Sequence, residues 1–293
     1  MDGFINFYKD TGMASNKALE RIKKLLRLEK AGFLGTLDPV ATGILPVACG
    51  WGTRFFPYFE KGAKKYRATI IFGAETDTQD STGKITATQP TTGITEERLL
   101  ETMNGFKGEI DQTPPMYSAK KINGKRLYEI ARKGGEVERK PKRVVVHSLE
   151  LDEFNGDTAV FTALVSQGTY IRTLCEDMGR KLGSAAHMGA LERTEAHVFR
   201  SDGSWTIERL EERRDFQNEW LLPLDFPLGS LPRVAVTERE EKSLLNGRFI
   251  FHTGDESGPT RIYTPEGIFI GVGRADHEGK KISPEKIMNR WAF

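Results

Sequence analysis

One loop-forming segment, residues 32–54, constrains this chain more than any other. Its one carboxylate is Asp38, which is followed by Pro39 and lies between Gly35 and Gly43. Proline biases the residue before it toward extended backbone, and glycine permits a positive φ or the close approach of a second backbone. The segment therefore predicts a stiff loop that holds one acid among apolar neighbours. The pattern alone leaves two interpretations open, because Asp and Gly also dominate ordinary turns: Asp38 either stabilises a turn or carries chemistry.

The chain has 293 residues, which suits one large domain or two smaller ones. A chain of this size buries about 75% of its unfolded surface, so we expect a substantial core. Its net charge of +2 does not by itself indicate a polyanionic partner. Residues 120–143, however, carry ten Lys or Arg against three Asp or Glu. Such a run is either a solvated surface or a patch that faces phosphates.

The cysteine, histidine and apolar patterns limit the possible cellular compartments and cofactors. Two cysteines, Cys49 and Cys175, cannot form a disulfide framework, which indicates a reducing environment. The cysteines and five histidines show no metal-binding spacing, so we expect no metal. Residues 1–6 lack the order of a signal peptide. The longest apolar run, residues 44–49, is far shorter than the roughly 20 residues that span a bilayer. We therefore expect a cytoplasmic protein with no membrane association.

Local patterns predict several elements. Residues 64–73 alternate apolar and polar side chains as a half-buried strand does. Residues 171–182 repeat apolar side chains at helical spacing and end at Gly183, which suits a helix and its C-cap. Two further helices are expected after Ser15 and Thr95, with these residues as N-caps. Other strands are expected at residues 4–8, 143–151 and 158–166, with a turn at 155–157.

The C-terminal part differs in composition from the rest. Three prolines in residues 222–232 mark a segment that we interpret as a linker. After it the chain shows only short β patterns, at residues 248–250, 261–263 and 267–274. These are typical of a small barrel.

Two side chains have both a structural and a functional interpretation. Arg172 falls in the first turn of a predicted helix, where the macrodipole disfavours a cation by roughly 0.3 kcal/mol or more. An anion is therefore expected beside it, and Glu176, four residues on, could supply one through a surface pair. Tyr66 lies at the start of a predicted strand, where it is either a core side chain or a platform on which a base stacks.

Several motifs occur in order along residues 3–200. The central one reads Gly-Thr-Leu-Asp-Pro at residues 35–39, followed by Ala-Thr-Gly at 41–43 and Leu-Pro at 45–46. Later come Lys-Lys-Tyr-Arg-Ala at 64–68, residues 75–83, Thr-Pro-Pro-Met-Tyr-Ser-Ala-Lys at 113–120, Gly-Thr-Tyr-Ile-Arg at 168–172 and Ala-His-Met-Gly-Ala-Leu-Glu-Arg-Thr at 186–194. Together they resemble the TruB family of tRNA pseudouridine-55 synthases. The Gly-Ile-Phe-Ile-Gly-Val-Gly run at 267–273 is similar to a PUA domain.

The resemblance implies an α+β fold. Residues 1–228 would form a pseudouridine-synthase catalytic domain with a central mixed or antiparallel sheet flanked by helices, and residues 229–293 a small, β-barrel-like PUA domain that binds RNA. It also implies isomerisation of uridine 55 in the T arm of tRNA without a cofactor, by a monomer that needs no protein partner. Two alternatives stay open: a subunit of a guide-RNA-dependent synthase, and an RNA-binding or RNA-folding module with weak or lost catalysis.

The resemblance also implies roles for individual residues. Asp38 would be the nucleophile, and whether it attacks C6 or C1′ or removes a sugar proton stays open. Arg172 and Tyr66 would be the other catalytic residues: Arg172 would pair with Asp38 or with a phosphate, and Tyr66 would stack on the target base. The expected substrate-binding residues are Lys9, Phe33, Tyr66, Tyr170 and Leu191, and the expected contacts to the RNA backbone are Lys64, Lys120, Lys121, Arg132 and Lys133.

Two positions depart from the family pattern. Asp10 stands where the family has proline, next to Lys9. Phe33 stands where the family usually has histidine. Phenylalanine can still stack in the space that an extracted base leaves, but it cannot donate a hydrogen bond or titrate. We therefore expect activity to persist without an inflection near the ordinary histidine pKa of about 6.5.

Overall fold

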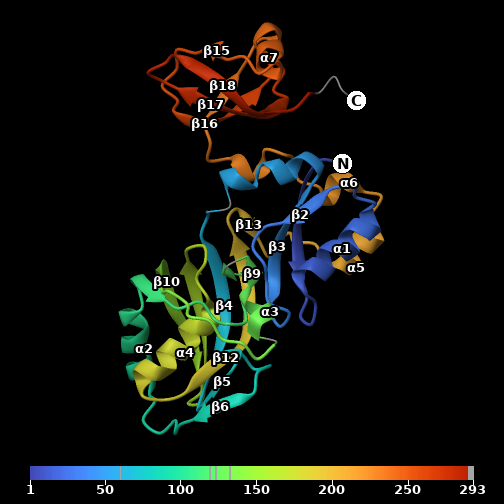
Figure 1. Cartoon of the computed structure of the whole chain (residues 1–293). Helices are drawn as coiled ribbons and strands as arrows, with labels where there is room; N and C mark the ends of the chain where they lie inside the picture. Colours follow the sequence, from blue (N-terminus) through green and yellow to red (C-terminus); the bar gives the residue numbers. More distant parts are fainter. Residues whose placement is uncertain (60, 119, 123, 132, 290–293) are drawn as a thin grey trace.

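The computed structural model of the chain describes residues 1–59, 61–118, 120–122, 124–131 and 133–289. Within these residues, nine strands form one curved mixed sheet (Figure 1). Seven follow one another in the order β1, β3, β12, β4, β11, β10, β7, while β2 pairs with β3 and β13 with β12. The strands are β1 (Gly3–Lys9), β2 (Ala31–Phe33), β3 (Thr42–Cys49), β4 (Lys64–Phe72), β7 (Gly108–Gln112), β10 (Lys142–Phe154), β11 (Thr158–Val165), β12 (Ala186–Ala196) and β13 (Phe199–Arg200).

The junction of β3 with β12 is the one parallel contact among the described strand pairs of this sheet. It consists of Glu192 opposite Thr42 and Arg193 opposite Gly43. Gly43 has φ +105°, and a Cβ at this position would lie 2.3 Å from the Arg193 carbonyl oxygen. Only glycine therefore lets the two backbones approach this closely. The contact brings β12 next to the loop that carries Asp38.

Two groups of helices cover the sheet (Figure 1). One group contains α1 (Ser15–Leu26), α5 (Ile207–Arg213) and α6 (Gln217–Trp220), and the other contains α2 (Glu96–Gly105) and α4 (Ile171–Leu182). Both groups contribute buried side chains to one core cluster, in which Ile22 of α1 and Leu174 of α4 are completely buried. The remaining elements of this part are the short helices η1 (Gly50–Arg54), η2 (Phe56–Tyr58), α3 (Leu127–Ala131) and η3 (Phe226–Leu228), and the hairpins β5 (Ala74–Thr76) with β6 (Ile85–Thr88) and β8 (Lys121–Ile122) with β9 (Lys125–Arg126).

The C-terminal part forms a separate sheet in the order β14, β16, β17, β18, β15. It docks on the first part through a second apolar cluster, in which Phe55 lies 5.6 Å from Phe269 between ring centroids. The Tyr58 hydroxyl also donates to Glu285 Oε2 at 2.8 Å. The elements are β14 (Arg233–Ala235), α7 (Glu238–Leu245), β15 (Ile250–Phe251), β16 (Gly258–Tyr263), β17 (Phe269–Asp276) and β18 (Lys281–Ile287).

The α+β class, the mixed sheet and the separate C-terminal β unit are confirmed. The predicted strand over 64–73 and the helix over 171–182 with its Gly183 cap are also confirmed, and Thr95 caps α2 as expected. The N-cap prediction at Ser15 is wrong, because Ala14 is the cap and Ser15 is the first helical residue. No helix in the described part of the chain has the length and apolar character that a membrane crossing needs.

The expected linker at residues 222–232 is not a free connection. Leu222 exchanges two backbone hydrogen bonds with Phe4, at 2.9 and 2.8 Å, and Leu228 is buried in the second apolar cluster. The segment therefore packs along the first part of the chain. Apolar side chains in it, which composition alone did not weigh, account for the difference.

Candidate active site

Asp38 lies in the loop between β2 and β3, and hydrogen bonds fix the backbone of the residues before and after it. The Ser15 hydroxyl accepts from the Leu37 backbone N–H and donates to the Leu37 carbonyl, each at 2.9 Å. On the other side, the Lys9 ammonium reaches the Pro39 carbonyl at 3.4 Å. Ser15 is therefore occupied in a tertiary contact, which explains why it does not cap its helix.

Lys9 stabilises this loop from the protein interior. Its side chain is completely buried, and the ammonium also donates to the carbonyls of Asp10 at 2.8 Å and Met13 at 2.9 Å. Burial lowers the pKa of Lys9 to about 8, although Asp10 and Asp38 oppose the shift. The sequence assigned Lys9 to substrate binding. In the structure its ammonium reaches the Pro39 carbonyl of the Asp38 loop, and a role in substrate binding stays a prediction.

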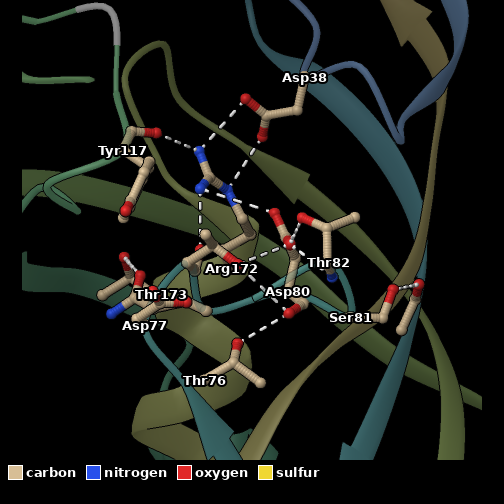
Figure 2. A network of polar contacts seen from close by, with 12 residues as sticks. Asp38, Thr76, Asp77, Asp80, Ser81, Thr82, Tyr117, Arg172 and Thr173 are labelled. Carbon is tan, nitrogen blue, oxygen red and sulfur yellow. Dashed lines mark hydrogen bonds and ion pairs between the residues drawn. The ribbon is translucent and has the colours of Figure 1, made fainter. Parts of the chain in front are cut away.

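Arg172, the second residue of α4, makes a bidentate contact with the Asp38 carboxylate. Its Nε lies 2.9 Å from Asp38 Oδ2, and its Nη2 donates to Asp38 Oδ1 at 3.2 Å (Figure 2). Nη1 and Nη2 also donate to the carbonyls of Thr78 and Tyr117, both at 2.9 Å. The Arg172 side chain is 5% exposed, whereas that of Asp38 is 34% exposed. The Arg172 side chain is thus buried and held in place, whereas the Asp38 carboxylate remains accessible.

The alternative partner for Arg172, Glu176, is engaged elsewhere. Its carboxylate forms an ion pair with Arg180 on the next turn of α4. The pairing of Arg172 with Asp38, which lies 134 residues away in the sequence, is therefore the one that forms. The anion required near the N-terminal end of this helix is therefore Asp38.

A second carboxylate, Asp80, was not identified from the sequence. Its Oδ2 lies 3.8 Å from Arg172 Nη1, while Oδ1 accepts from the Thr82 backbone N–H at 3.0 Å and from the hydroxyls of Thr78 and Thr82 at 2.8 and 2.5 Å (Figure 2). The sequence indicated only Asx-type turns in residues 75–83. Such turns do form, and they aim Asp80 at the buried face of Arg172. The position of Asp80 in a family-like block was the available signal.

A pocket of about 250 Å³ opens beside Asp38. This is just below the roughly 300–1,000 Å³ of typical ligand sites, and it suits one nucleotide rather than a folded RNA arm. Tyr66 and Leu191, both 8% exposed, lie in its wall with Tyr170. The five predicted site residues that line it together are Asp38, Tyr66, Tyr170, Arg172 and Leu191, and Lys64, predicted to contact the RNA backbone, joins them.

Gln112 fixes the backbone of Tyr170. Its Oε1 accepts from the Tyr170 backbone N–H at 3.0 Å, and its Nε2 donates to the Tyr170 carbonyl at 3.2 Å. Gln112 is 1% exposed at the end of β7. The two bonds hold the N-cap residue of α4, directly before Ile171 and Arg172. No sequence pattern singled out Gln112, because its role depends on which backbone lies within its reach.

Other predicted site residues lie outside the pocket. Phe33 does not line it and instead packs, half-buried, against the main core cluster. Lys133 is exposed, Lys120 is half-buried, and neither lines the pocket. Arg132 and the side chain of Lys121 lie outside the described part of the structure. In the described ranges, no three His, Cys, Asp or Glu side chains gather as a metal site requires.

The ionisation of Asp38 leads to a pH prediction. Burial raises the pKa of the Asp38 carboxyl above its ordinary 3.8, and the Arg172 guanidinium opposes the rise. If the ionised carboxylate is the reactive form, kcat/KM should fall as the pH drops through a midpoint above 3.8, because protonation removes the nucleophile. No further inflection is expected near 6.5, since Phe33 cannot titrate. Values of kcat/KM from single turnovers at subsaturating enzyme concentration, from about pH 3 to 9, test this.

Phe33→His is the comparison for that profile. The variant is expected to stay within about tenfold of the wild type and to add at most a small step near pH 6.5. A wild-type profile with its acid midpoint at or below 3.8 would contradict the raised pKa. A Phe33→His variant more than tenfold faster would show that the native site is impaired.

Three family models match consecutive parts of the chain. Residues 23–171 match the N-terminal domain of the TruB family pseudouridylate synthases. Residues 172–228 match the tRNA pseudouridylate synthase B C-terminal domain, and residues 232–288 match the C-terminal part of pseudouridine synthase II TruB. Together these models cover most of the described chain.

Curated relatives and solved structures agree with these matches. The chain is 41% identical to tRNA pseudouridine synthase B of Caldanaerobacter subterraneus over 98% of this chain and 99% of the relative. It is 40% identical to the protein of the same name from Syntrophomonas wolfei, over 94% of each. A chain from an H/ACA RNP bound to a substrate RNA containing 2′-deoxyuridine shares the fold, with TM-score 0.75 at 24% identity over 99% of this chain and 86% of that one. The chain belongs to the TruB family of pseudouridylate synthases.

Proposed function

We propose that this enzyme isomerises one uridine in the T loop of tRNA, at position 55, to pseudouridine, without a cofactor. The observation that carries the proposal is the two-pronged hold of Arg172 on Asp38 at the wall of a pocket for one nucleotide. Relatives named tRNA pseudouridine synthase B, at about 40% identity over nearly the whole chain, support tRNA as the substrate.

The chemistry requires little beyond a nucleophile and a closed pocket. The N1–C1′ bond of the uridine breaks, a C5–C1′ bond forms, the hydrogen on C5 leaves as a proton, and N1 takes up a proton. Atoms and electrons balance without an oxidant or a reductant. In this proposal Asp38 supplies the nucleophile, and an ionised carboxylate needs no activating base. Arg172 keeps it charged and oriented.

The target base has to leave its stack in the folded loop, which costs a few kcal/mol. We assign Tyr66 as the side chain on which the extracted base stacks, since aromatic stacking is worth about 1–3 kcal/mol per base. Tyr170, the N-cap of α4, and Leu191 of β12 would pack around the base. These contacts together are large enough to offset the extraction.

The RNA-facing surface is proposed to extend beyond the pocket. Residues 120–143 carry the main basic excess of the chain, and Tyr117, just before them, contacts Arg172 through its carbonyl. We propose that Lys120 and Lys133 contact the RNA backbone from there, and that residues 229–293 act as a PUA-like RNA-binding domain on a catalytic domain of residues 1–228. We also propose a cytoplasmic monomer. Its two described cysteines are both free and buried, as suits a reducing compartment.

A guide-RNA-dependent subunit is the second candidate, because chains of H/ACA particles share this fold. The likeness to them is at 24% identity and concerns the fold alone. The purified chain and a tRNA transcript labelled with 5-tritiated uridine distinguish the two. We expect release of about one equivalent of tritium per tRNA without any protein or guide RNA, since C5 loses its hydrogen on joining C1′. Release only after addition of a guide RNA and partner proteins would support the second candidate.

Absence of release under all conditions, with tRNA binding intact, would point to an RNA-binding module. A transcript with cytidine in place of the target uridine is the control for site selectivity. Release from that transcript equal to that from the wild-type tRNA would contradict a single T-loop target.

A further inference from the structure

Arg193 is a buried cation in the wall of the same pocket. It lies on β12 with 1% of its surface exposed. Its Nε donates to the Ile44 carbonyl at 2.7 Å, and its Nη2 donates to the Gly35 carbonyl at 2.8 Å. These carbonyls lie on either side of Asp38 in the sequence. Arg193 therefore joins the two ends of the loop that carries the nucleophile.

The remaining nitrogen of Arg193, Nη1, has a different environment. It forms no hydrogen bond to the described residues, and no Asp or Glu among them lies within ion-pair distance of the Arg193 guanidinium. The nearby carboxylate of Asp38 is already engaged by Arg172. A buried guanidinium without a carboxylate partner is costly, which raises the question of which anion it accommodates.

A second cation converges on the same place. A Cβ added to Gly35 would lie 3.2 Å from Arg193 Nη1 and 3.1 Å from Lys64 Nζ. Gly35 has φ +72° and no side chain, which lets both cationic groups lie directly against the loop. Gly35, Lys64 and Arg193 all line the pocket. Two cationic groups at one edge of a nucleotide-sized pocket form an anion site.

The proposed substrate carries one kind of anion next to its base, a phosphodiester. We propose that Arg193, with Lys64 beside it, binds a phosphate that flanks the target uridine, and that the same guanidinium positions the Asp38 loop. The inference rests on the proposed function, in which the target nucleotide occupies this pocket. Arginine suits the task because its planar fork can hold two carbonyls and a phosphate at once. Docking of the phosphate and placement of the nucleophile then depend on one side chain.

The test is a double-mutant cycle that measures the coupling between the Arg193 side chain and the phosphate. Two T-arm stem-loop RNAs carry a neutral methylphosphonate in place of the phosphate on the 5′ side or on the 3′ side of the target uridine. Wild type should lose about tenfold in kcat/KM on one of them, as expected for a lost charged hydrogen bond. Arg193→Gln should lose about tenfold or more on the natural RNA. It should lose nothing further on that methylphosphonate RNA.

The matched control is Lys65→Gln. Lys65 is the neighbouring cation on β4, 40% exposed beside Glu195, and it does not line the pocket. Its loss on natural RNA should be less than threefold, and the methylphosphonate should still cost the control variant the full tenfold. Losses for Arg193→Gln that multiply with those of both methylphosphonates would overturn the proposal and leave Arg193 as a structural residue only.

A second variant and the binding affinities distinguish loss of the phosphate contact from loss of folding or of the proposed function. Lys64→Gln gives an independent cycle on the same RNAs and replaces Arg193→Gln if that variant proves too unstable to purify. The dissociation constants of all protein–RNA pairs are measured as well. If wild type binds the stem-loop but releases no tritium, the proposed function fails, while the cycle in binding affinity still decides the phosphate contact.

Discussion

Replacement of Asp38 with Asn is expected to reduce the single-turnover rate of isomerisation by at least about 10⁴-fold, as loss of an enzyme nucleophile does. The amide has the same size but no charge with which to attack. Binding of tRNA should change by less than about threefold, because most of the affinity comes from phosphate contacts elsewhere. Asp80, 3.8 Å from Arg172 Nη1, continues to compensate the buried guanidinium, so the variant should fold. Tritium release and filter binding measure the two quantities.

Asp10→Asn is the matched control for that experiment. Asp10 is an exposed acid on the neighbouring turn, and its side chain does not line the pocket. The control should retain activity within about threefold of the wild type. If Asp38→Asn itself kept its activity within tenfold of the wild type, Asp38 would not be the nucleophile, even though Arg172 binds it.

Arg172→Lys is expected to have the second largest effect, a loss of about 10²–10³-fold in the single-turnover rate. Lysine keeps the charge, but an ammonium cannot engage both oxygens of Asp38 and the carbonyls of Thr78 and Tyr117 together. The carboxylate then loses its fixed orientation. Stability should fall by about 3 kcal/mol, because buried acceptors lose their donor. Rates and denaturant unfolding curves measure the two effects.

Arg180→Lys tests whether that effect is specific. Arg180 lies on the same helix and is 56% exposed, while its partners Glu75 and Glu176 are 18% and 8% exposed. Lysine keeps a cation beside both carboxylates and Arg180 does not touch Asp38, so this variant should unfold within about 1 kcal/mol of the wild type and keep its rate. Equal losses in Arg180→Lys and Arg172→Lys would indicate that both act only through the stability of α4. A rate within tenfold of wild type for Arg172→Lys would contradict the positioning role.

The network around Arg172 explains why both effects are expected to be large. One guanidinium lies between Asp38 and Asp80, and three donors from Thr78 and Thr82 fix Asp80 (Figure 2). The charge of Asp80 is therefore satisfied within the protein, whereas Asp38 keeps a face open to the pocket. This asymmetry leaves one of the two carboxylates available for reaction.

Much of the local structure was predictable from short-range signals. The alternation over residues 64–73 and the apolar spacing over 171–182 correspond to β4 and α4, because each pattern matches the period of its element. The turn at 155–157 lies between β10 and β11, where Asn and Gly favour it. The exception was Ser15. Its hydroxyl could cap a helix or bond to Leu37, and only the packed loop decides between them.

Local sequence patterns were enough to identify the candidate groups: a lone acid in a glycine-bounded loop, an arginine in need of an anion at the start of a helix, and motifs that resemble a family with those parts. How these groups are held became visible only in the folded chain. Asp80, Gln112 and Arg193 act through backbone carbonyls, N–H groups and charges that are 58 to 158 residues away or on separate elements. Such contacts have no period or spacing in the sequence, because they depend on which strands and loops the fold brings within hydrogen-bonding distance.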